Sequence, residues 1–324
     1  MKKETPCKIT SIGGSALIEG IMMRGPKKTT VAVRVGEEEI YTENLDAKTL
    51  GEKYKFFKTP FIRGFASLID SMKLSYKSLM ISANKALEAG EIEEEEPGRF
   101  EKWLTEKFGD KLMSVLMVFS TIIGFALAIF LFFFLPTFLY DLIAFEGSVL
   151  YGNVFFKSVF EGILKIALFL GYIVLVARMN EMKRVFMYHG AEHKTIACYE
   201  AGEELTPENI KKHTRFHPRC GTSFLVYMLI LGILIGLFIP YFPGAFSWLR
   251  PAIKILILPI TCGIGYELLR LCGKFNNAVT RALSTPGIWA QHITTKEPDE
   301  KMLEVAIAAM KSVIPEDGTD IVKK

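Results

Sequence analysis

Residues 113–140 carry no charged side chain, and few folds can accommodate such a stretch. The sequence there is MSVLMVFSTIIGFALAIFLFFFLPTFLY. About 20 apolar residues in a helix cover the roughly 30 Å hydrocarbon core of a bilayer, so this stretch is long enough to cross a membrane. An ordinary soluble domain is therefore excluded. Since 50% of all residues are hydrophobic, a mainly disordered chain is excluded as well.

Three further stretches have the length and apolarity of membrane spans: 158–177, 223–242 and 252–271. Together with the first they predict an α-helical polytopic membrane protein with four transmembrane helices. Charges inside a span are costly and usually pair. Because Glu161 and Lys165 lie four residues apart in the second span, we expect them to pair with each other.

Basic residues between the spans predict the orientation. The loop 178–222 is rich in Lys and Arg, whereas 141–157 and 243–251 contain one basic residue each, Lys157 and Arg250. The positive side of a membrane protein is the cytoplasmic one. Both termini are therefore expected in the cytoplasm of a multi-pass cell-membrane protein, with the lipid bilayer as partner. The net charge of only +4 argues against binding of nucleic acid.

The regions outside the spans suggest a small cytoplasmic α+β N-terminal region. Alternating apolar residues on both sides of Gly36 predict a β-hairpin over 30–42. Helical spacing over 61–87 predicts an amphipathic helix, either packed on the body of the protein, which we favour, or lying on the membrane. The expected organisation is an N-terminal region, an acidic linker with a pre-membrane helix, a membrane domain and a C-terminal tail, at 1–87, 88–112, 113–271 and 272–324.

Two other segments have recognisable features. Residues 13–25, GGSALIEGIMMRG, contain four glycines and Glu19 in an apolar setting. They fit either a loop with an exposed Glu19 or a functional backbone turn. In the tail, Asp299 is a suitable N-cap for an amphipathic helix that begins at Glu300.

Four of the five histidines are clustered between residues 189 and 217. His189-Gly-Ala-Glu192-His193 fits the H-x-x-E-H pattern of inverted zincins. On a helix the two histidines share one face and can chelate one metal ion, while Glu192 beside them can act as a general base.

Two histidines do not hold a catalytic Zn²⁺ firmly, so further ligands are required. His213, His217 and Cys220 are the candidates, and imidazole and thiolate both suit Zn²⁺. Three alternatives stay open: a catalytic site with three protein ligands, a closed structural site formed by His189, His193, His217 and Cys220, or no metal. Glu267, near the end of the last span, is a further possible ligand.

The second span is expected to continue as a helix past Ala177. His189 would then lie 12 residues, or roughly 18 Å, beyond its end. Such a site lies in the cytoplasm near the lipid headgroups, where it can meet a substrate at the membrane face.

Four blocks of the sequence resemble the bacterial YqhQ-like family of membrane proteins, in the same order and over nearly the full length. They are GGSALIEGIMMRG, YHGAEHKTIACYE, HPRCGTSF and LSTPGIWAQHITTKEPDEKMLEVAIAAMK. The family is described as predicted metal-dependent enzymes. The resemblance therefore implies a metal and residence in the cytoplasmic membrane. The residues that match its metal-type blocks are His189, Glu192, His193, His217 and Cys220.

These observations favour a zinc-dependent membrane hydrolase or peptidase with Glu192 as the catalytic residue. Its metal ligands would come from His189, His193, His217 and Cys220. The expected substrate is a membrane-associated peptide or a lipid-linked molecule. The alternative is a non-catalytic assembly or interaction protein whose metal stabilises the 178–222 loop.

Overall fold

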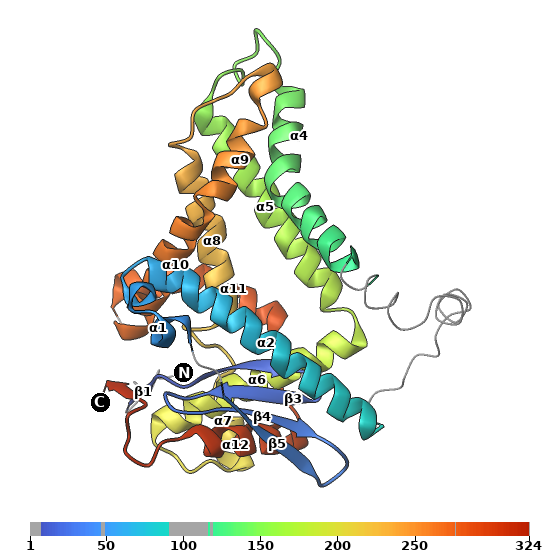
Figure 1. Ribbon diagram of the computed structural model, residues 1–324, viewed down its shortest axis with the longest axis vertical. Coiled ribbons are helices and arrows are strands. Elements are labelled where there is room, and N and C mark those ends of the chain that lie inside the picture. Colours follow the sequence, from blue (N-terminus) through green and yellow to red (C-terminus); the bar gives the residue numbers. More distant parts are fainter. Residues whose placement is uncertain (1–7, 47–48, 91–115, 117–118, 276, 324) are drawn as a thin grey trace, which may run out of the picture. The chain divides into compact units, whose positions relative to one another are not determined.

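The computed structural model describes residues 8–46, 49–90, 116, 119–275 and 277–323 (Figure 1). The chain divides into two compact units. The first comprises 1–92, 171–228 and 259–324, and the second comprises 93–170 and 229–258. The predicted linker and pre-membrane helix at 88–112 lie outside the described residues, apart from Glu88, Ala89 and Gly90.

A four-stranded antiparallel sheet forms the centre of the first unit. Its strands follow one another in chain order: β2 (Gly13–Leu17), β3 (Gly20–Arg24), β4 (Thr29–Arg34) and β5 (Ile40–Leu45). The hairpin predicted over 30–42 is present as β4 and β5. The glycine-rich segment 13–25 is a second hairpin and not a loop. Its turn residue Glu19 has a positive φ of 49° and is buried, so of the two alternatives the loop with an exposed Glu19 is wrong.

Helices cover both faces of the sheet (Figure 1). The helices α6 (Asn180–Ala201) and α12 (Glu300–Val313) share a core with Ile21, Met23 and Ala32. On the opposite face, Leu74 of α2 (Ile62–Glu88) packs with Leu17, Met22, Val31, Val33 and Leu45. Neighbouring residues of a strand point to opposite faces, so covering both faces buries the two central strands, β3 and β4, along nearly their whole length.

The predicted tail helix is α12, and it begins where the sequence indicates. The Asp299 side chain accepts a hydrogen bond of 2.9 Å from the Met302 amide, which caps the helix. Its buried face includes Met302, Leu303, Ala306 and Met310. This face completes the sheet's core, although α12 lies more than 250 residues after the strands.

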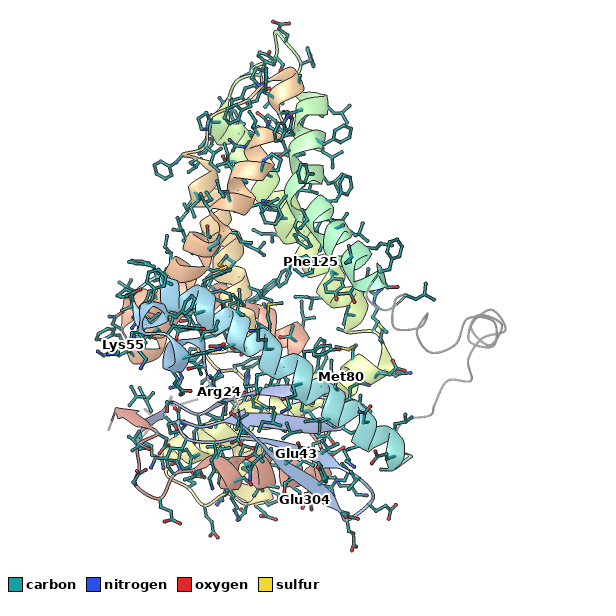
Figure 2. The ribbon with its side chains drawn as sticks, in the orientation of Figure 1. Arg24, Glu43, Lys55, Met80, Phe125 and Glu304 are labelled. Carbon is teal, nitrogen blue, oxygen red and sulfur yellow. The ribbon has the colours of Figure 1, made fainter. Side chains whose placement is uncertain are left out.

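The predicted amphipathic helix over 61–87 is α2. The residues that it buries are mainly small, among them Ala66, Ser78 and Ala86. Larger apolar side chains on its other face, including Tyr76 and Met80, are exposed (Figure 2).

Short elements complete the first unit. A two-stranded sheet pairs β1 (Ile9–Thr10) with β6 (Ile321–Lys323). Further helices wholly or partly within this unit include α1 (Leu50–Lys53), η1 (Lys55–Lys58), α7 (Pro207–Lys212), α8 (Gly221–Gly236), α10 (Leu258–Lys274) and α11 (Ala278–Thr294).

Two helices of the described chain are long and apolar enough to cross a membrane, Phe119–Ile143 and α5 (Val154–Val176). The first contains a π-helical turn, η2 (Phe130–Phe134), followed by α4 (Leu135–Ile143), and exposes apolar side chains such as Phe125 (Figure 2). A third crossing is possible if η3 (Gly244–Phe246) with α9 (Leu249–Leu256) and α10, bent by 44°, count as one span. The predicted span over 223–242 corresponds to α8, which ends at Gly236. The protein thus has the apolar helices of a membrane protein.

Buried charges in the second unit pair differently from the expectation. Glu161 is 1% exposed and binds Arg250 at 3.2 Å and the Lys254 ammonium group. The expected pair of Glu161 with Lys165 is therefore wrong, because α9 brings two cations to the same carboxylate.

The expected continuation of the second span through Ala177 is also wrong. Helix α5 ends at Val176, and α6 starts at Asn180 as a separate helix. Between them, Met179 has an extended backbone (φ −71°, ψ 136°) that interrupts the helical hydrogen bonding. The 18 Å spacing for His189 therefore does not apply.

Candidate metal centre

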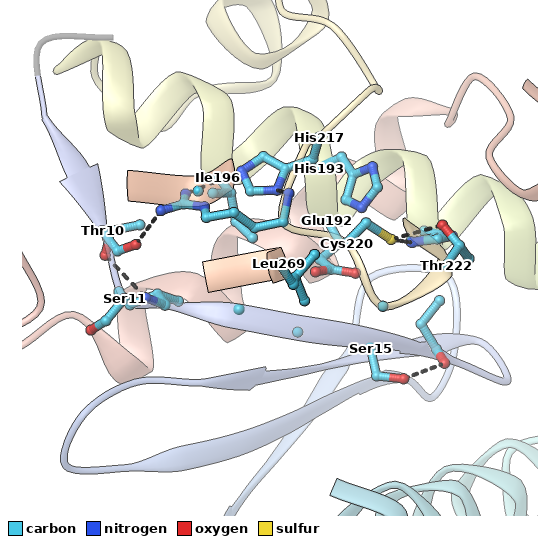
Figure 3. Close-up of a pocket in the computed structure, with 18 of the residues that line it drawn as sticks. Thr10, Ser11, Ser15, Glu192, His193, Ile196, His217, Cys220, Thr222 and Leu269 are labelled. Carbon is cyan, nitrogen blue, oxygen red and sulfur yellow. Dashed lines mark hydrogen bonds between the residues drawn. The ribbon is translucent and has the colours of Figure 1, made fainter. Parts of the chain in front are cut away.

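The H-x-x-E-H motif lies on α6, and its two histidines approach a cysteine from another segment (Figure 3). His189 Nε2 is 3.2 Å from the Sγ of Cys220, the residue just before α8. One donor atom from each of His189, His193 and Cys220 lies within 4.8 Å of the others. Three of the predicted metal ligands are therefore brought together.

Backbone carbonyls fix the orientation of both imidazoles. Thr294 O, at the end of α11, lies 2.8 Å from His189 Nδ1, and Arg215 O lies 2.6 Å from His193 Nδ1. Each Nδ1 must donate in these bonds, because a carbonyl only accepts. Both Nε2 atoms are then the ones available to a ligand. Metal-binding histidines usually make such a second hydrogen bond.

The donor set fits a zinc-like ion. Two imidazole nitrogens and one thiolate are ligands that Zn²⁺ prefers, and three protein ligands leave a fourth tetrahedral position for water or substrate. The carboxylate-rich environment that suits Mg²⁺ or Ca²⁺ is not formed by these three residues.

The charges at the cluster favour a thiolate. Burial alone would raise the pKa of Cys220, but the imidazoles of His189 and His193 hold it well below its ordinary value. Burial alone would lower the pKa of His189, but the Cys220 thiolate and the Thr294 carbonyl raise it to about 9. Anionic sulfur is the form that binds metal ions.

Glu192 lies on the same side of α6 and is 5% exposed. Burial raises the pKa of Glu192, although the imidazoles of His193 and His189 and the nearby Gly14 amide of β2 act in the opposite direction. A Cβ on Gly14 would lie 3.0 Å from the Glu192 carboxyl carbon and 2.6 Å from Met22 O. The glycine therefore allows the strand to approach the carboxylate closely.

The other glycine of the motif, Gly190, has a packing role. The chain after α11 crosses α6 at this point, and Lys296 N donates a hydrogen bond of 2.8 Å to Phe186 O. A Cβ on Gly190 would lie only 2.0 Å from Lys296 O. This crossing also positions the Thr294 carbonyl that holds His189.

His217, a predicted ligand, is not among the three donors that lie together. Its ring centroid is 5.6 Å from that of His193. The Arg219 Nη2 atom lies 3.2 Å from His217 Nε2, and Glu200 lies 3.9 Å from the same nitrogen. Burial chiefly lowers the pKa of His217 to about 4, although Glu200 opposes this shift. In this arrangement a neutral His217 accepts a hydrogen bond from Arg219.

Gln291, which no pattern in the sequence indicated, holds the segment of His217 in place. Its Oε1 accepts from His217 N at 2.8 Å, and its Nε2 donates to His217 O at 2.7 Å. Gln291 is fully buried. The available signal was its position in a block that resembles the YqhQ-like family.

Two other candidate ligands lie elsewhere. His213 forms a second group with Cys198 and Glu203, in which His213 Nε2 and Glu203 Oε2 are 3.2 Å apart. Glu267 binds Arg63 through two hydrogen bonds of 2.6 Å. His213 and Glu267 are therefore not part of the cluster at His189.

A cavity of about 800 Å³ opens beside the cluster (Figure 3). Residues 9–16 line it on one side, and α10 contributes residues such as Tyr266 and Leu269. His189, Glu192, His193 and Cys220 also line it. The volume lies within the range of small-molecule and cofactor sites in proteins.

Comparison with known proteins identifies the family. A family model described as "Protein of unknown function (DUF1385)" matches residues 59–316. The chain is also 32% identical over 307 residues to a Bacillus subtilis (strain 168) protein named "Uncharacterized protein YqhQ", covering 93% of this chain and 92% of the relative. No solved structure matches. The chain therefore belongs to the DUF1385 family, which the resemblance of its sequence blocks to YqhQ-like proteins had indicated.

Proposed function

We propose that this protein is a zinc-dependent hydrolase of the cell membrane whose site faces the cytoplasm. The single observation that carries this proposal is the convergence of His189, His193 and Cys220 beside Glu192 in a cavity. A Zn²⁺ ion bound by these three ligands would supply Lewis acidity and activate water for attack on a carbonyl or phosphoryl group.

The chain's own residues would perform the proton transfers. Glu192, close to Gly14 of β2, would accept a proton from the attacking water and deliver it to the leaving group. The carbonyls of Thr294 and Arg215 would keep both imidazoles in one tautomer and orientation. The Gln291 hydrogen bonds would keep the segment before Cys220 at the correct distance.

The test is Glu192→Gln, which keeps the shape and hydrogen-bonding capacity but cannot take up a proton at neutral pH. A general base typically contributes about 10²- to 10⁴-fold to the rate, so the variant should fail to complement a null strain. Its zinc content and unfolding temperature should match those of the unchanged protein. Full complementation by a zinc-loaded Glu192→Gln protein would rule out this mechanism.

The second candidate is a non-catalytic assembly or interaction protein with a structural metal. The proximity of the His217 ring to His193 favours it, because His217 as a fourth ligand would close the site. In that case Glu192→Gln is mild, whereas His217→Ala and Cys220→Ser release the metal. Zinc content and complementation measured on the same three variants distinguish the two functions.

We also propose four membrane crossings with both termini in the cytoplasm. The apolar α8 and the bent pair of α9 and α10 would supply the third and fourth crossings. Support comes from the many basic residues of 178–222 and the few in 141–157 and 243–251.

Reporter fusions test this topology. A reporter that works only in the cytoplasm should be active after Lys324, and a reporter that works only outside the cytoplasm should be active within 141–157. Equal signals from the same side at both positions would contradict four crossings.

A further inference from the structure

The strand β2 is an edge of the sheet and faces the cavity beside the candidate metal centre. Within the described chain, β2 pairs only with β3, and residues 9–16 all line the cavity. An edge strand presents backbone N–H and C=O groups that can pair with another chain. Natural proteins usually cover or disrupt such edges, so an edge that lines a cavity suggests a ligand.

The register identifies which backbone groups face outwards. Leu17 and Gly20 close a two-residue turn, so the bonded pairs with β3 are at Leu17, Ser15 and Gly13. Gly14 and Ala16 therefore direct their N–H and C=O groups away from β3. The Glu192 carboxylate lies close to Gly14, since a Cβ on Gly14 would be 3.0 Å from its carboxyl carbon.

Ala16 offers the free groups. No hydrogen bond from its amide is found among the residues that the structure describes. Its carbonyl accepts only a long bond of 3.4 Å from the Ser15 hydroxyl (Figure 3). Ala16 lies two residues after Gly14, the interval at which outward-facing backbone groups recur along a strand. A further strand would therefore form its next ladder hydrogen bonds at Ala16.

The side chains of this strand leave room for a second backbone. Residues 13–16 are Gly, Gly, Ser and Ala. Glycine within a strand often marks a place where a ligand or another backbone approaches closely. A Cβ on Gly13 would meet nothing within 4 Å, so the face of the strand is open at this residue.

The part of the cavity wall that α10 forms indicates where such a ligand comes from. It includes Leu269, Arg270 and Lys274 of α10, a helix that belongs to a candidate membrane span. The cavity therefore lies between a strand edge and a helix with an apolar body and a basic end. A polypeptide segment close to the membrane, with an apolar or acidic side chain on that side, would suit this wall.

We propose that the β2 edge binds an extended polypeptide segment as an added antiparallel or parallel strand, which passes Glu192 and the His189–His193–Cys220 cluster. Alternating N–H and C=O groups match another backbone, and this mode of recognition gives affinity with little dependence on sequence. The inference rests on the proposed function for what happens to the bound segment. It names the substrate class of the hydrolase as polypeptide and not as a lipid-linked molecule.

The binding test uses the full-length Glu192→Gln protein in detergent with Zn²⁺, so that no bound probe is hydrolysed. The probe is a fluorescein-labelled library of random ten-residue peptides. Two variants are compared in this background. Ala16→Pro lacks the outward N–H, and proline is tolerated at an edge strand where that N–H faces outwards. The matched control, Ala16→Gly, keeps the N–H.

The expected result is peptide retention by Glu192→Gln and by the Ala16→Gly control, with about tenfold weaker retention by Ala16→Pro. Tenfold is the effect of losing one backbone hydrogen bond whose partner becomes buried and unpaired. Zinc content and unfolding temperature should agree between the two Ala16 variants, which shows that the fold survives. Equal retention by both variants, or retention of undecaprenyl phosphate in place of the peptides, would overturn the proposal.

A separate measurement keeps this inference distinct from the hydrolase proposal. The retained peptides are incubated with the unchanged protein and analysed by mass spectrometry. Retention that depends on the Ala16 amide, without cleavage, supports strand addition and refutes peptide hydrolysis. Hydrolysis of a lipid-linked substrate, with no peptide retained, refutes strand addition and leaves the hydrolase intact.

Discussion

Replacing His189 with alanine is expected to lower the affinity for Zn²⁺ by at least about 100-fold, or about 3 kcal/mol. Loss of groups that only support a ligand already costs about 10- to 100-fold, and His189 would be a ligand itself. The substitution leaves two donors, His193 and Cys220, which is too few for a firm site. Metal content of detergent-purified protein and competition with a colorimetric chelator measure the effect.

The matched control is His213→Ala, the same substitution in the separate group of Cys198, Glu203 and His213. It should leave the affinity at the His189 cluster unchanged. Cys220→Ser and Cys198→Ser form a second pair with the same expected contrast. Equal zinc content in unchanged protein and His189→Ala would refute a metal at this cluster.

Replacing Gly190 with alanine is expected to destabilise the first unit by about 3 kcal/mol, the upper end for overpacking. Helix propensity alone predicts the opposite sign, since alanine is favoured over glycine by about 1 kcal/mol. The clash decides the sign, because the new Cβ would lie 2.0 Å from the rigid Lys296 carbonyl. Thr294 would move with this segment, so zinc affinity should fall as well.

Thermal unfolding in detergent and zinc titration test this second prediction. The control is Gly171→Ala in α5, where a Cβ would meet nothing within 4 Å. It should be neutral or slightly stabilising, as propensity predicts. If Gly190→Ala were as stable as this control, the close crossing of α6 by the 294–298 segment would be wrong.

Local patterns were sufficient for several parts of the fold. The hairpin at β4 and β5, the helix α2 and the capped start of α12 at Asp299 follow from turn residues, apolar period and capping chemistry. The two long apolar helices also follow from composition alone. In each case the deciding interaction lies within a few residues of the chain.

Long-range contacts explain what the sequence did not predict. The motif suggested His189, His193 and Cys220 as ligands, but nothing local distinguishes Cys220 from His213 or His217. Which residue joins the two histidines depends on where α8 begins relative to α6. It also depends on Gln291, which lies some 70 residues after His217 and binds its backbone. The same holds for segment 13–25, for which a loop with an exposed Glu19 and a functional backbone turn were both open. It forms two strands joined by a turn at Glu19, and α6 and α12 share a core with Ile21 and Met23 of the second strand.

The contribution of α12 to the core of the sheet has a consequence for biosynthesis. The last sheet strand ends at Leu45, whereas α12 begins at Glu300. At roughly 5–20 residues per second, a ribosome needs about 13–50 s to make the intervening chain. Throughout that interval the side chains of Ile21, Met23 and Ala32 lack α12, one of the two helices that share their core. The apolar helices of the second unit are synthesised in the same interval, so the nascent strands must avoid aggregation while those helices leave the ribosome. Folding of the first unit, and with it assembly of the His189 cluster, is therefore completed only after translation has passed Val313.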